Sequence, residues 1–315
     1  MRIALVKMSS MGDVIHALPV VSDILRANPQ ASIDWIVEEL FVPLVRLHPG
    51  VNQILPVSLR QWRRQWRDPL VRQQFHSVRA DFKTRQYDLI LDLQGLLKSA
   101  WVGSWLTGPR AGYGWACARE PLACLAYQQR YQVDMQSHAI EKMRSLAGQS
   151  LGYTVENAPQ FGLQTAAAAG ADPYWVFLHA TSRAEKLWPI AASVEFLKLA
   201  GSRGVPVLLP WGSDSERTAA KDLVARAGHG TVLDRLDLGG CASLLAQAQG
   251  VVGVDTGLTH LAAALDRPTV ALFSATEAFR YGPYWSTRAK SLGSPGQWPG
   301  ADLVIETLDK LLELS

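Results

Sequence analysis

The chain lacks several features that mark large classes of protein. Its 315 residues include only three cysteines, and none of them belongs to a C-x-x-C pair. This argues against a zinc site or a disulfide framework. No apolar run approaches the roughly 20 residues that a membrane span needs, and the N-terminus enters a strand pattern without a signal-peptide pattern. We therefore expect a cytoplasmic protein with free thiols.

Common nucleotide and hydrolase motifs are missing as well. No G-x-G-x-x-G follows a strand pattern, which counts against a nicotinamide or flavin cofactor, and no G-x-x-x-x-G-K-[ST] marks a P-loop. H-E-x-x-H and G-x-S-x-G are absent, which removes the commonest hydrolase signatures. No acidic cluster suited to a metal is visible in the sequence. We therefore expect neither a cofactor nor a metal.

Charge is present but local. The net charge of +3 over the chain is too small for the basic surface of a nucleic-acid binder. Residues 60–67, RQWRRQWR, nevertheless concentrate four arginines and two tryptophans. In a helix the arginines fall largely on one face: Arg60, Arg63, Arg64 and Arg67. The alternative is a plain solvated surface. We expect Trp62 and Trp66 to be packing anchors, in a position that also suits a membrane interface.

Apolar runs alternate with helical patterns along both halves of the chain, which predicts parallel sheets covered on both faces. In the first half the predicted strands are 2–7, 33–38, 53–57, 87–93 and 111–115, and the predicted helices are 16–27, 39–47, 67–85, 96–106, 119–130 and 137–150. In the second half the predicted strands are 174–180, 205–211, 231–234, 251–255 and 269–275, and the predicted helices are 190–202, 213–227, 240–248, 257–265 and 301–314.

An Ala-, Gly- and Pro-rich stretch separates the two halves and predicts a linker over 154–173. The prediction is thus an α/β protein with a Rossmann-like domain over 1–153 and a second over 174–300. Two such domains in tandem face a cleft, and ligands bind outside the carboxyl ends of the strands. The loops after the strands are therefore the candidate site.

Three of these loops in the second half suit a nucleotide diphosphate. In VDTGLTHLAAAL, residues 254–265, a strand ends and a helix begins, so free N–H groups and the helix dipole face the loop. The other two loops supply hydroxyl groups, a cation, an aromatic ring and a carboxylate. The candidates are Asp255, Thr256, Gly257, His260, Thr181, Ser182, Lys186, Trp211 and Glu216. Helix caps and solvated loops are the alternative for each segment alone.

The first loop of the chain, in MSSMGDVIHALP at residues 8–19, carries a carboxylate where a phosphate-binding loop would avoid one. If the second domain holds the diphosphate, Asp13 is free to take a proton from an acceptor hydroxyl, which is general-base work. Gly12 would then permit the tight turn that exposes it. The alternative is that Asp13 only caps the following helix.

Taken in order, several motifs resemble the bacterial heptosyltransferases of lipopolysaccharide core assembly, most closely those of type I. They are VKMSSMGDVIHALP at the start, DWIVEE (34–39), RQWRRQW (60–66), LDLQGLLKSA (91–100), AREPLA (118–123), HATSRAEKLWP (179–189), LPWG (209–212) and VDTGLTHLAAALDRP (254–268). The resemblance covers nearly the whole chain. It implies a GT-B fold in which a C-terminal helix, here 301–315, packs back on the first domain.

The resemblance also implies a reaction and a set of residues. An inverting transfer would move L-glycero-D-manno-heptose from ADP-heptose to the first Kdo of Kdo2–lipid A, with Asp13 as the base and the second-domain candidates above holding the donor. Arginine forks suit the carboxylates and phosphates of such an acceptor. The expected acceptor-binding residues are Ser10, Gly12, Arg60, Arg63, Arg64, Lys98 and Arg119. We expect a monomer, with at most peripheral contact with the inner membrane.

Four alternatives stay open at this point. The first is a heptosyltransferase of type II or III, which uses a heptosylated acceptor. The second is a nucleotide-sugar epimerase or hydrolase of the same fold, which has little use for clustered arginines. The third is a lipid-binding protein without catalysis, and the fourth is a nucleic-acid binder. The roles of Asp92, Gln94 and Arg183 are unassigned.

Overall fold

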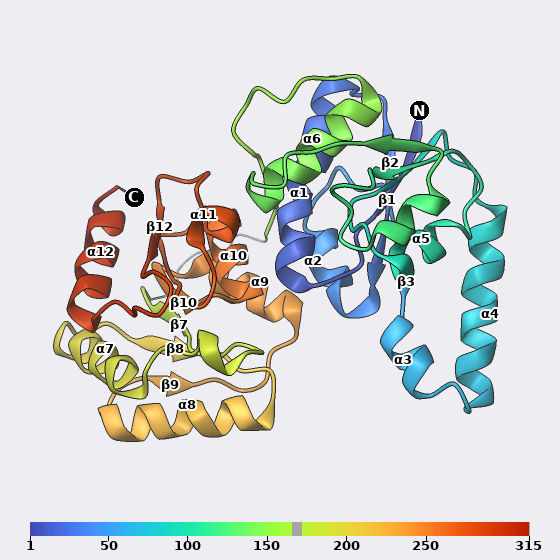
Figure 1. Ribbon diagram of the computed structural model, residues 1–315. Coiled ribbons are helices and arrows are strands. Elements are labelled where there is room, and N and C mark those ends of the chain that lie inside the picture. The colour runs from blue at the N-terminus through green and yellow to red at the C-terminus, as the bar shows by residue number, and fades with distance from the viewer. Residues whose placement is uncertain (166–171, 315) are drawn as a thin grey trace. The chain divides into compact units, whose positions relative to one another are not determined.

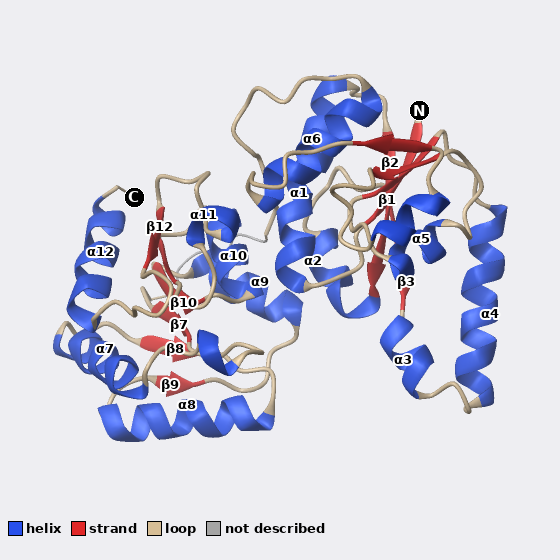
Figure 2. Ribbon diagram, viewed as in Figure 1, coloured by secondary structure: helices blue, strands red, loops and turns tan. Residues whose placement is uncertain are grey.

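The computed structural model describes residues 1–165 and 172–314. The chain forms two compact units, Met1–Gly162 and Leu163–Ser315. Their boundary falls inside the predicted linker 154–173, of which residues 166–171 lie outside the described residues. Both units combine a β-sheet with helices (Figures 1 and 2). In the described part of the chain, no helix is both long enough and apolar enough to cross a membrane.

The first unit is built on a six-stranded, parallel sheet in the order β3-β2-β1-β4-β5-β6. This is the strand order of dinucleotide-binding folds, in which the switch point lies between β1 and β4. The central strands are buried on both sides, as their continuous apolar runs predict. The strands are β1 (Arg2–Val6), β2 (Ser32–Glu38), β3 (Gln53–Val57), β4 (Leu89–Asp92), β5 (Arg110–Tyr113) and β6 (Gln129–Tyr131).

Helices cover both faces of this sheet. One face carries α1 and α6, which pack against each other, together with α2. The other carries α3, α4 and α5, whose aromatic residues join the sheet in one core cluster. The bounds are α1 (Met11–Ala27), α2 (Val42–Arg46), α3 (Leu59–Arg64), α4 (Pro69–Thr84), α5 (Leu97–Gly103) and α6 (Ala139–Leu151), with short 3₁₀ turns at Glu39–Phe41 and Pro121–Ala126.

The predicted helix over 119–130 was wrong. Only Pro121–Ala126 is helical, as a 3₁₀ turn, and the chain then enters β6. Proline at the start of the segment fits a first helical turn. The predicted helix 67–85 is confirmed as α4, which begins two residues later because Asp68 caps it by accepting from the Leu70 amide at 2.8 Å.

The second unit repeats the plan. Its six parallel strands follow the order β12-β11-β10-β7-β8-β9, so its switch point lies between β7 and β10. The strands are β7 (Trp175–Leu178), β8 (Val207–Leu209), β9 (Thr231–Val232), β10 (Gly250–Val254), β11 (Thr269–Leu272) and β12 (Ala289–Leu292). The helices are α7 (Ile190–Ser202), α8 (Asp214–Ala227), α9 (Leu238–Gln247), α10 (Gly257–Ala264), α11 (Ala278–Tyr281) and α12 (Ala301–Glu313), with a 3₁₀ turn at Ala184–Lys186.

The C-terminal helix is part of the second unit, and its expected contact with the first domain stays a prediction. Residues Val304, Ile305, Leu308 and Leu311 of α12 are buried in the core of the second unit, where the helix contacts α7, β10 and β11. Spacings of three and four place these side chains on one helical face. Because that apolar face is already buried against its own sheet, the helix completes the second unit.

Candidate active site

The candidate residues gather at the switch point of each sheet. In the first unit Asp13 lies in the first turn of α1, after β1, and Asp92 and Gln94 lie at the end of β4 and in the loop that follows it. In the second unit the loop after β7 carries Lys186, and the loop from β10 to α10 carries Asp255. Switch points are where open α/β sheets bind ligands. Each unit is described separately below.

Asp13 is the third residue of α1, not its cap, because Ser10 precedes the helix. Its Oδ2 accepts from the Ser10 amide at 3.0 Å and from the Ser10 hydroxyl at 2.8 Å. Its Oδ1 lies 3.6 Å from Lys7 Nζ. Gly12 is helical, so the tight turn predicted there is not formed. The carboxylate is instead exposed by its place at the first turn of α1.

The surroundings of Asp13 keep its carboxylate ionised. Burial raises its pKa, but the charge of Lys7, the hydrogen bonds from Ser10 and the charge of Arg119 together outweigh it, so the pKa lies below its usual value. The side chain of Asp13 is 35% exposed, whereas that of Lys7 is 8% exposed. A partly exposed, ionised carboxylate with one oxygen beyond hydrogen-bond distance of its neighbouring cation is able to accept a proton.

The β4–α5 segment contacts the loop that precedes α1. Asp92 Oδ1 accepts from the amides of Gln94 and Gly95 at 2.8 and 3.1 Å, which fixes the turn. Gln94 Oε1 then accepts from the Met8 amide at 2.8 Å. Lys98 Nζ donates to Ser9 Oγ at 3.0 Å. Gln94 and Lys98 therefore both bond to the segment that precedes α1, and the acceptor-binding role expected for Lys98 stays a prediction.

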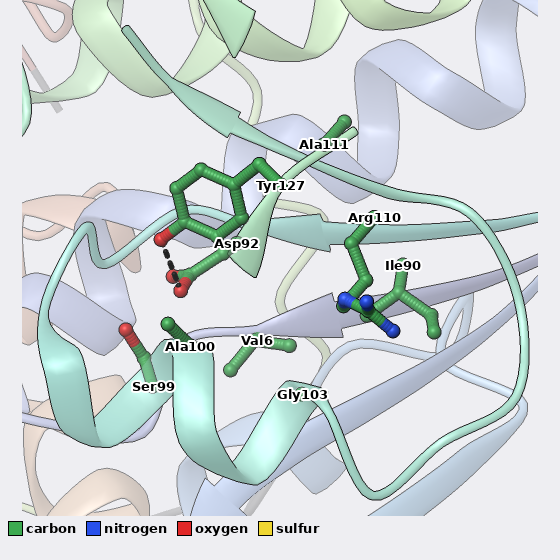
Figure 3. Close-up of a pocket in the computed structure, with 9 residues that line it drawn as sticks. All are labelled: Val6, Ile90, Asp92, Ser99, Ala100, Gly103, Arg110, Ala111 and Tyr127. Atoms are coloured by element: carbon green, nitrogen blue, oxygen red, sulfur yellow. Dashed lines mark hydrogen bonds between the residues drawn. The ribbon is translucent and has the colours of Figure 1, made fainter. Parts of the chain in front are cut away.

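The side chain of Asp92 is buried in the first unit. Burial raises its pKa above the usual value, although hydrogen bonds from Ser99 and Tyr127 and from the loop amides oppose the shift. The Tyr127 hydroxyl donates to Asp92 Oδ2 at 2.7 Å. Figure 3 shows this pair in a small crevice. The crevice is lined by Val6, Ile90, Asp92, Ser99, Ala100, Gly103, Arg110, Ala111 and Tyr127. It is a packing feature beneath the loop rather than a substrate site.

The predicted acceptor-binding cations are only partly brought together. Arg60 and Lys98 both lower the pKa of Glu38, although burial raises it overall, so both lie near the carboxyl end of β2. Arg63 and Arg64 are exposed at the end of α3. Arg67 was expected on the same helical face, but α3 ends at Arg64 and Arg67 lies in the turn that follows.

In the second unit, Asp255 is the centre of a hydrogen-bonded cluster. Its Oδ2 accepts from Lys186 Nζ at 2.5 Å and from the Thr276 hydroxyl at 2.6 Å, and its Oδ1 lies 3.4 Å from His260 Nε2. The Thr181 hydroxyl donates to the backbone oxygen of Asp255 at 3.2 Å. Loops after β7, β10 and β11 thus converge on one carboxylate.

The ionised form of Asp255 is strongly favoured. Burial raises its pKa, but hydrogen bonds from His260, Lys186 and Thr276 outweigh burial and hold the pKa well below its usual range. The side chains of Asp255 and Lys186 are 10% and 15% exposed. This carboxylate is therefore a fixed anchor for the cations around it, rather than a group that exchanges protons.

The remaining donor-site candidates surround this cluster. Thr256 precedes α10, which begins at Gly257, so the amides of the first turn face the loop. Ser182 is exposed in the loop after β7. The sequence missed Thr276, which the structure adds to the cluster. Among the described residues, no group of three or more His, Cys, Asp or Glu side chains is arranged to hold a metal ion.

Trp211 and Glu216 lie after β8. The Trp211 indole N–H donates to the Leu233 carbonyl at 2.7 Å, and the Arg217 guanidinium lies 5.2 Å from the ring centre. Glu216 Oε2 accepts from the Gly212 amide at 2.7 Å. These bonds fix both side chains at the carboxyl end of the sheet. The ring and the second carboxylate oxygen are features that suit a base and a ribose.

Two Rossmann-like units, one with a braced and partly exposed carboxylate and the other with an anion-suited helix start, define the architecture of a GT-B glycosyltransferase. The model of glycosyltransferase family 9 (heptosyltransferase) matches residues 75–312. The chain belongs to this family, and it is a glycosyltransferase.

Individual proteins similar to this chain are also heptosyltransferases. The chain is 44% identical to lipopolysaccharide heptosyltransferase 1 of Pseudomonas aeruginosa, over 90% of this chain and 81% of that protein. The structure of E. coli heptosyltransferase WaaC with ADP has a TM-score of 0.92 at 36% identity, covering 99% of this chain and all of the other. WaaC with ADP-2-deoxy-2-fluoro heptose has a TM-score of 0.88 at the same identity, covering 98% and 99%. Lipopolysaccharide heptosyltransferase 2 of Salmonella typhimurium is 26% identical, over 87% and 82%.

Proposed function

We propose that this chain is a type I lipopolysaccharide heptosyltransferase, which moves heptose from ADP-heptose to the first Kdo of Kdo2–lipid A. The higher identity to a type 1 than to a type 2 relative supports the acceptor, and the ligands named for the E. coli structures support the donor. This assignment places the protein in the cytoplasm, where it acts as a monomer without a metal or cofactor.

Asp13 is the proposed general base. The acceptor hydroxyl loses its proton to Asp13 Oδ1 as its oxygen attacks the anomeric carbon, and the bond from that carbon to the diphosphate breaks on the opposite face. The configuration therefore inverts. The observation that carries this role is the geometry of the carboxylate, whose Oδ2 is held by Ser10 while its Oδ1 stays 3.6 Å from Lys7. The Ser10 bonds that hold the base make Ser10 a positioning residue in this proposal.

The second unit supplies the donor site in this proposal. Lys186, the first amides of α10 and the hydroxyls of Thr181, Ser182 and Thr256 would stabilise the charge that develops on the departing ADP. Trp211 and Glu216 would hold the nucleoside. Asp255 would orient the side chains of Lys186 and His260 through its contacts with both.

The acceptor is anionic, and the first unit offers cations for it. Lys98, which donates to Ser9, and Arg119, whose charge acts on Asp13, would hold the Kdo carboxylates. Arg60, Arg63 and Arg64 would bind the outer anionic groups. Gly12, next to Asp13, leaves the approach to the base free of a side chain. The clustered cations favour a transferase over an epimerase or hydrolase of the same fold.

The test measures ADP release from ADP-heptose with two acceptors. One is de-acylated Kdo2–lipid A, and the other is the same molecule already carrying one heptose. The proposal expects turnover only on the acceptor without heptose. Turnover only on the heptosylated acceptor would keep the family but reassign the chain to type II. ADP release at the same rate without any acceptor would indicate a hydrolase.

A further inference from the structure

Exposed aromatic side chains lie on the hairpin of α3 and α4 and on the neighbouring helix α5. Trp66, in the turn of the hairpin, and Trp101, on α5, are 45% and 47% exposed. Both pack on the buried ring of Phe75, with ring centres 5.2 and 6.0 Å away, so the same ring supports both side chains. Leu70, at the start of α4, is 73% exposed. Figure 1 shows the turn between α3 and α4 at the end of the hairpin that points away from the sheet.

This surface is not needed to complete the core. Trp62, Trp105 and Phe82 already fill the space between the hairpin and the sheet, each at 3% exposure or less. The outer tryptophans lie on top of that layer and leave nearly half of their area in water. Large exposed aromatic surfaces of this kind mark interaction sites.

The charge around the aromatic side chains is mostly positive. Residues 59–80 contain six arginines and a single acidic residue, Asp68. Asp68 is engaged as the cap of α4. Arg67 flanks Trp66 in the turn, and Arg72 lies on α4 next to Val71; both side chains are exposed. An aromatic and aliphatic surface bordered by arginines is complementary to an anionic phospholipid bilayer, where indoles settle at the headgroup level.

We propose that Trp66, Leu70, Trp101, Arg67 and Arg72, together the hairpin patch, dock the protein on an anionic bilayer. The indoles and Leu70 enter the interface between headgroups and acyl chains, and the arginines meet lipid phosphates. This proposal goes beyond the proposed function. It rests on that function in one respect, which is that a lipid-linked acceptor would bring the protein to a membrane.

Sedimentation of the full chain with vesicles, without substrates, tests the patch. The vesicles contain phosphatidylcholine alone or phosphatidylcholine with phosphatidylglycerol. The parent protein should bind the anionic vesicles more tightly, and binding should weaken as salt rises from about 0.1 to about 1 M, since the screening length falls from about 10 to about 3 Å. The double substitution Arg67→Gln, Arg72→Gln should lower vesicle affinity by at least about tenfold, at roughly fivefold per arginine.

A second pair probes the apolar part. Trp66→Ser with Trp101→Ser should also lower binding to anionic vesicles at least about tenfold, while the thermal midpoint and circular dichroism show whether the fold is kept. The arginine pair tests the patch independently should the tryptophan pair unfold. Phe279→Ser, which removes a 63% exposed ring from the second unit, is the matched control and should bind as the parent does.

The outcomes separate the patch from the proposed function. Folded variants that lose vesicle binding but keep their turnover of de-acylated acceptor would support the membrane-docking role of the patch. Equal binding of parent and arginine variant, or equal binding of the parent to neutral and anionic vesicles, overturns it. Absence of turnover on any acceptor would overturn the proposed function and leave the vesicle result standing.

Discussion

The two units share one strand order, yet they treat the lysine and the aspartate at their switch points differently. In the first unit Lys7 is 8% exposed and Asp13 is 35% exposed, with 3.6 Å between their charged atoms. In the second, Asp255 is 10% exposed and is bonded to Lys186 at 2.5 Å. The first arrangement presents an ionised carboxylate, and the second uses a carboxylate to fix cations. In the proposed function, one fold serves proton removal in one copy and anion binding in the other.

Replacing the presented carboxylate should have the largest effect. Asp13→Asn keeps the shape of the side chain but removes its basicity, so kcat should fall about 10²- to 10⁴-fold. The KM for ADP-heptose and the thermal midpoint should stay near those of the parent. Steady-state ADP release measures both constants. Asp302→Asn, in the first turn of α12, is the matched control for a helix-start carboxylate. Near-normal turnover of Asp13→Asn would remove Asp13 from the chemistry.

Removing the fixed cation should affect the other substrate. Lys186→Met deletes a charge that would bind the diphosphate, so the KM for ADP-heptose should rise about 10- to 100-fold. The KM for the acceptor should change little. Lys310→Met, which breaks an exposed pair with Glu306 in the same unit, serves as the control. An unchanged donor KM would show that Lys186 belongs to the structure of the loop only.

Replacing the arginines of α3 should affect the acceptor KM and leave the donor KM unchanged. The triple substitution of Arg60, Arg63 and Arg64 by Ala should raise the acceptor KM by about tenfold or more, a modest effect because exposed charges are screened. The donor KM should not change. Arg226→Ala, a surface arginine of the second unit, controls for net charge. Equal damage to the KM for donor and acceptor would argue against an acceptor role.

The smallest expected effect is a pH shift. Lys7 lowers the pKa of Asp13, so Lys7→Met should raise that pKa and leave more of the base protonated at a given acidic pH. The acid limb of kcat/KM should therefore move up by about one pH unit. Lys7→Arg keeps the charge and should keep the limb in place. Profiles that coincide for the parent and Lys7→Met would show that Lys7 does not tune the base.

Strong periodicity made most of the fold predictable. The strand 53–57 and the helix 190–202 were predicted with the bounds that the structure has. β6 was missed because its three residues, Gln129–Tyr131, carry no apolar run. The amphipathic stripe of α12 indicates that one face is buried and not what covers it, and the structure shows that the core of the second unit does.

The candidate site divides in the same way. Asp255 and Lys186 were found because each follows a strand, and the structure joins them in one pair. Thr276 was missed, since nothing in its local sequence distinguishes it from other loop hydroxyls. Lys7 reads as the end of a strand, and only the fold places its Nζ next to Asp13. Contacts between residues far apart in the chain are what the local pattern leaves out.

Calorimetric titration of ADP into Asp13→Asn and Lys186→Met tests the division between the two units most directly. The account predicts that Asp13→Asn binds ADP with the affinity of the parent, whereas Lys186→Met binds it at least about tenfold more weakly. Weakened ADP binding by Asp13→Asn, with parental binding by Lys186→Met, would contradict it.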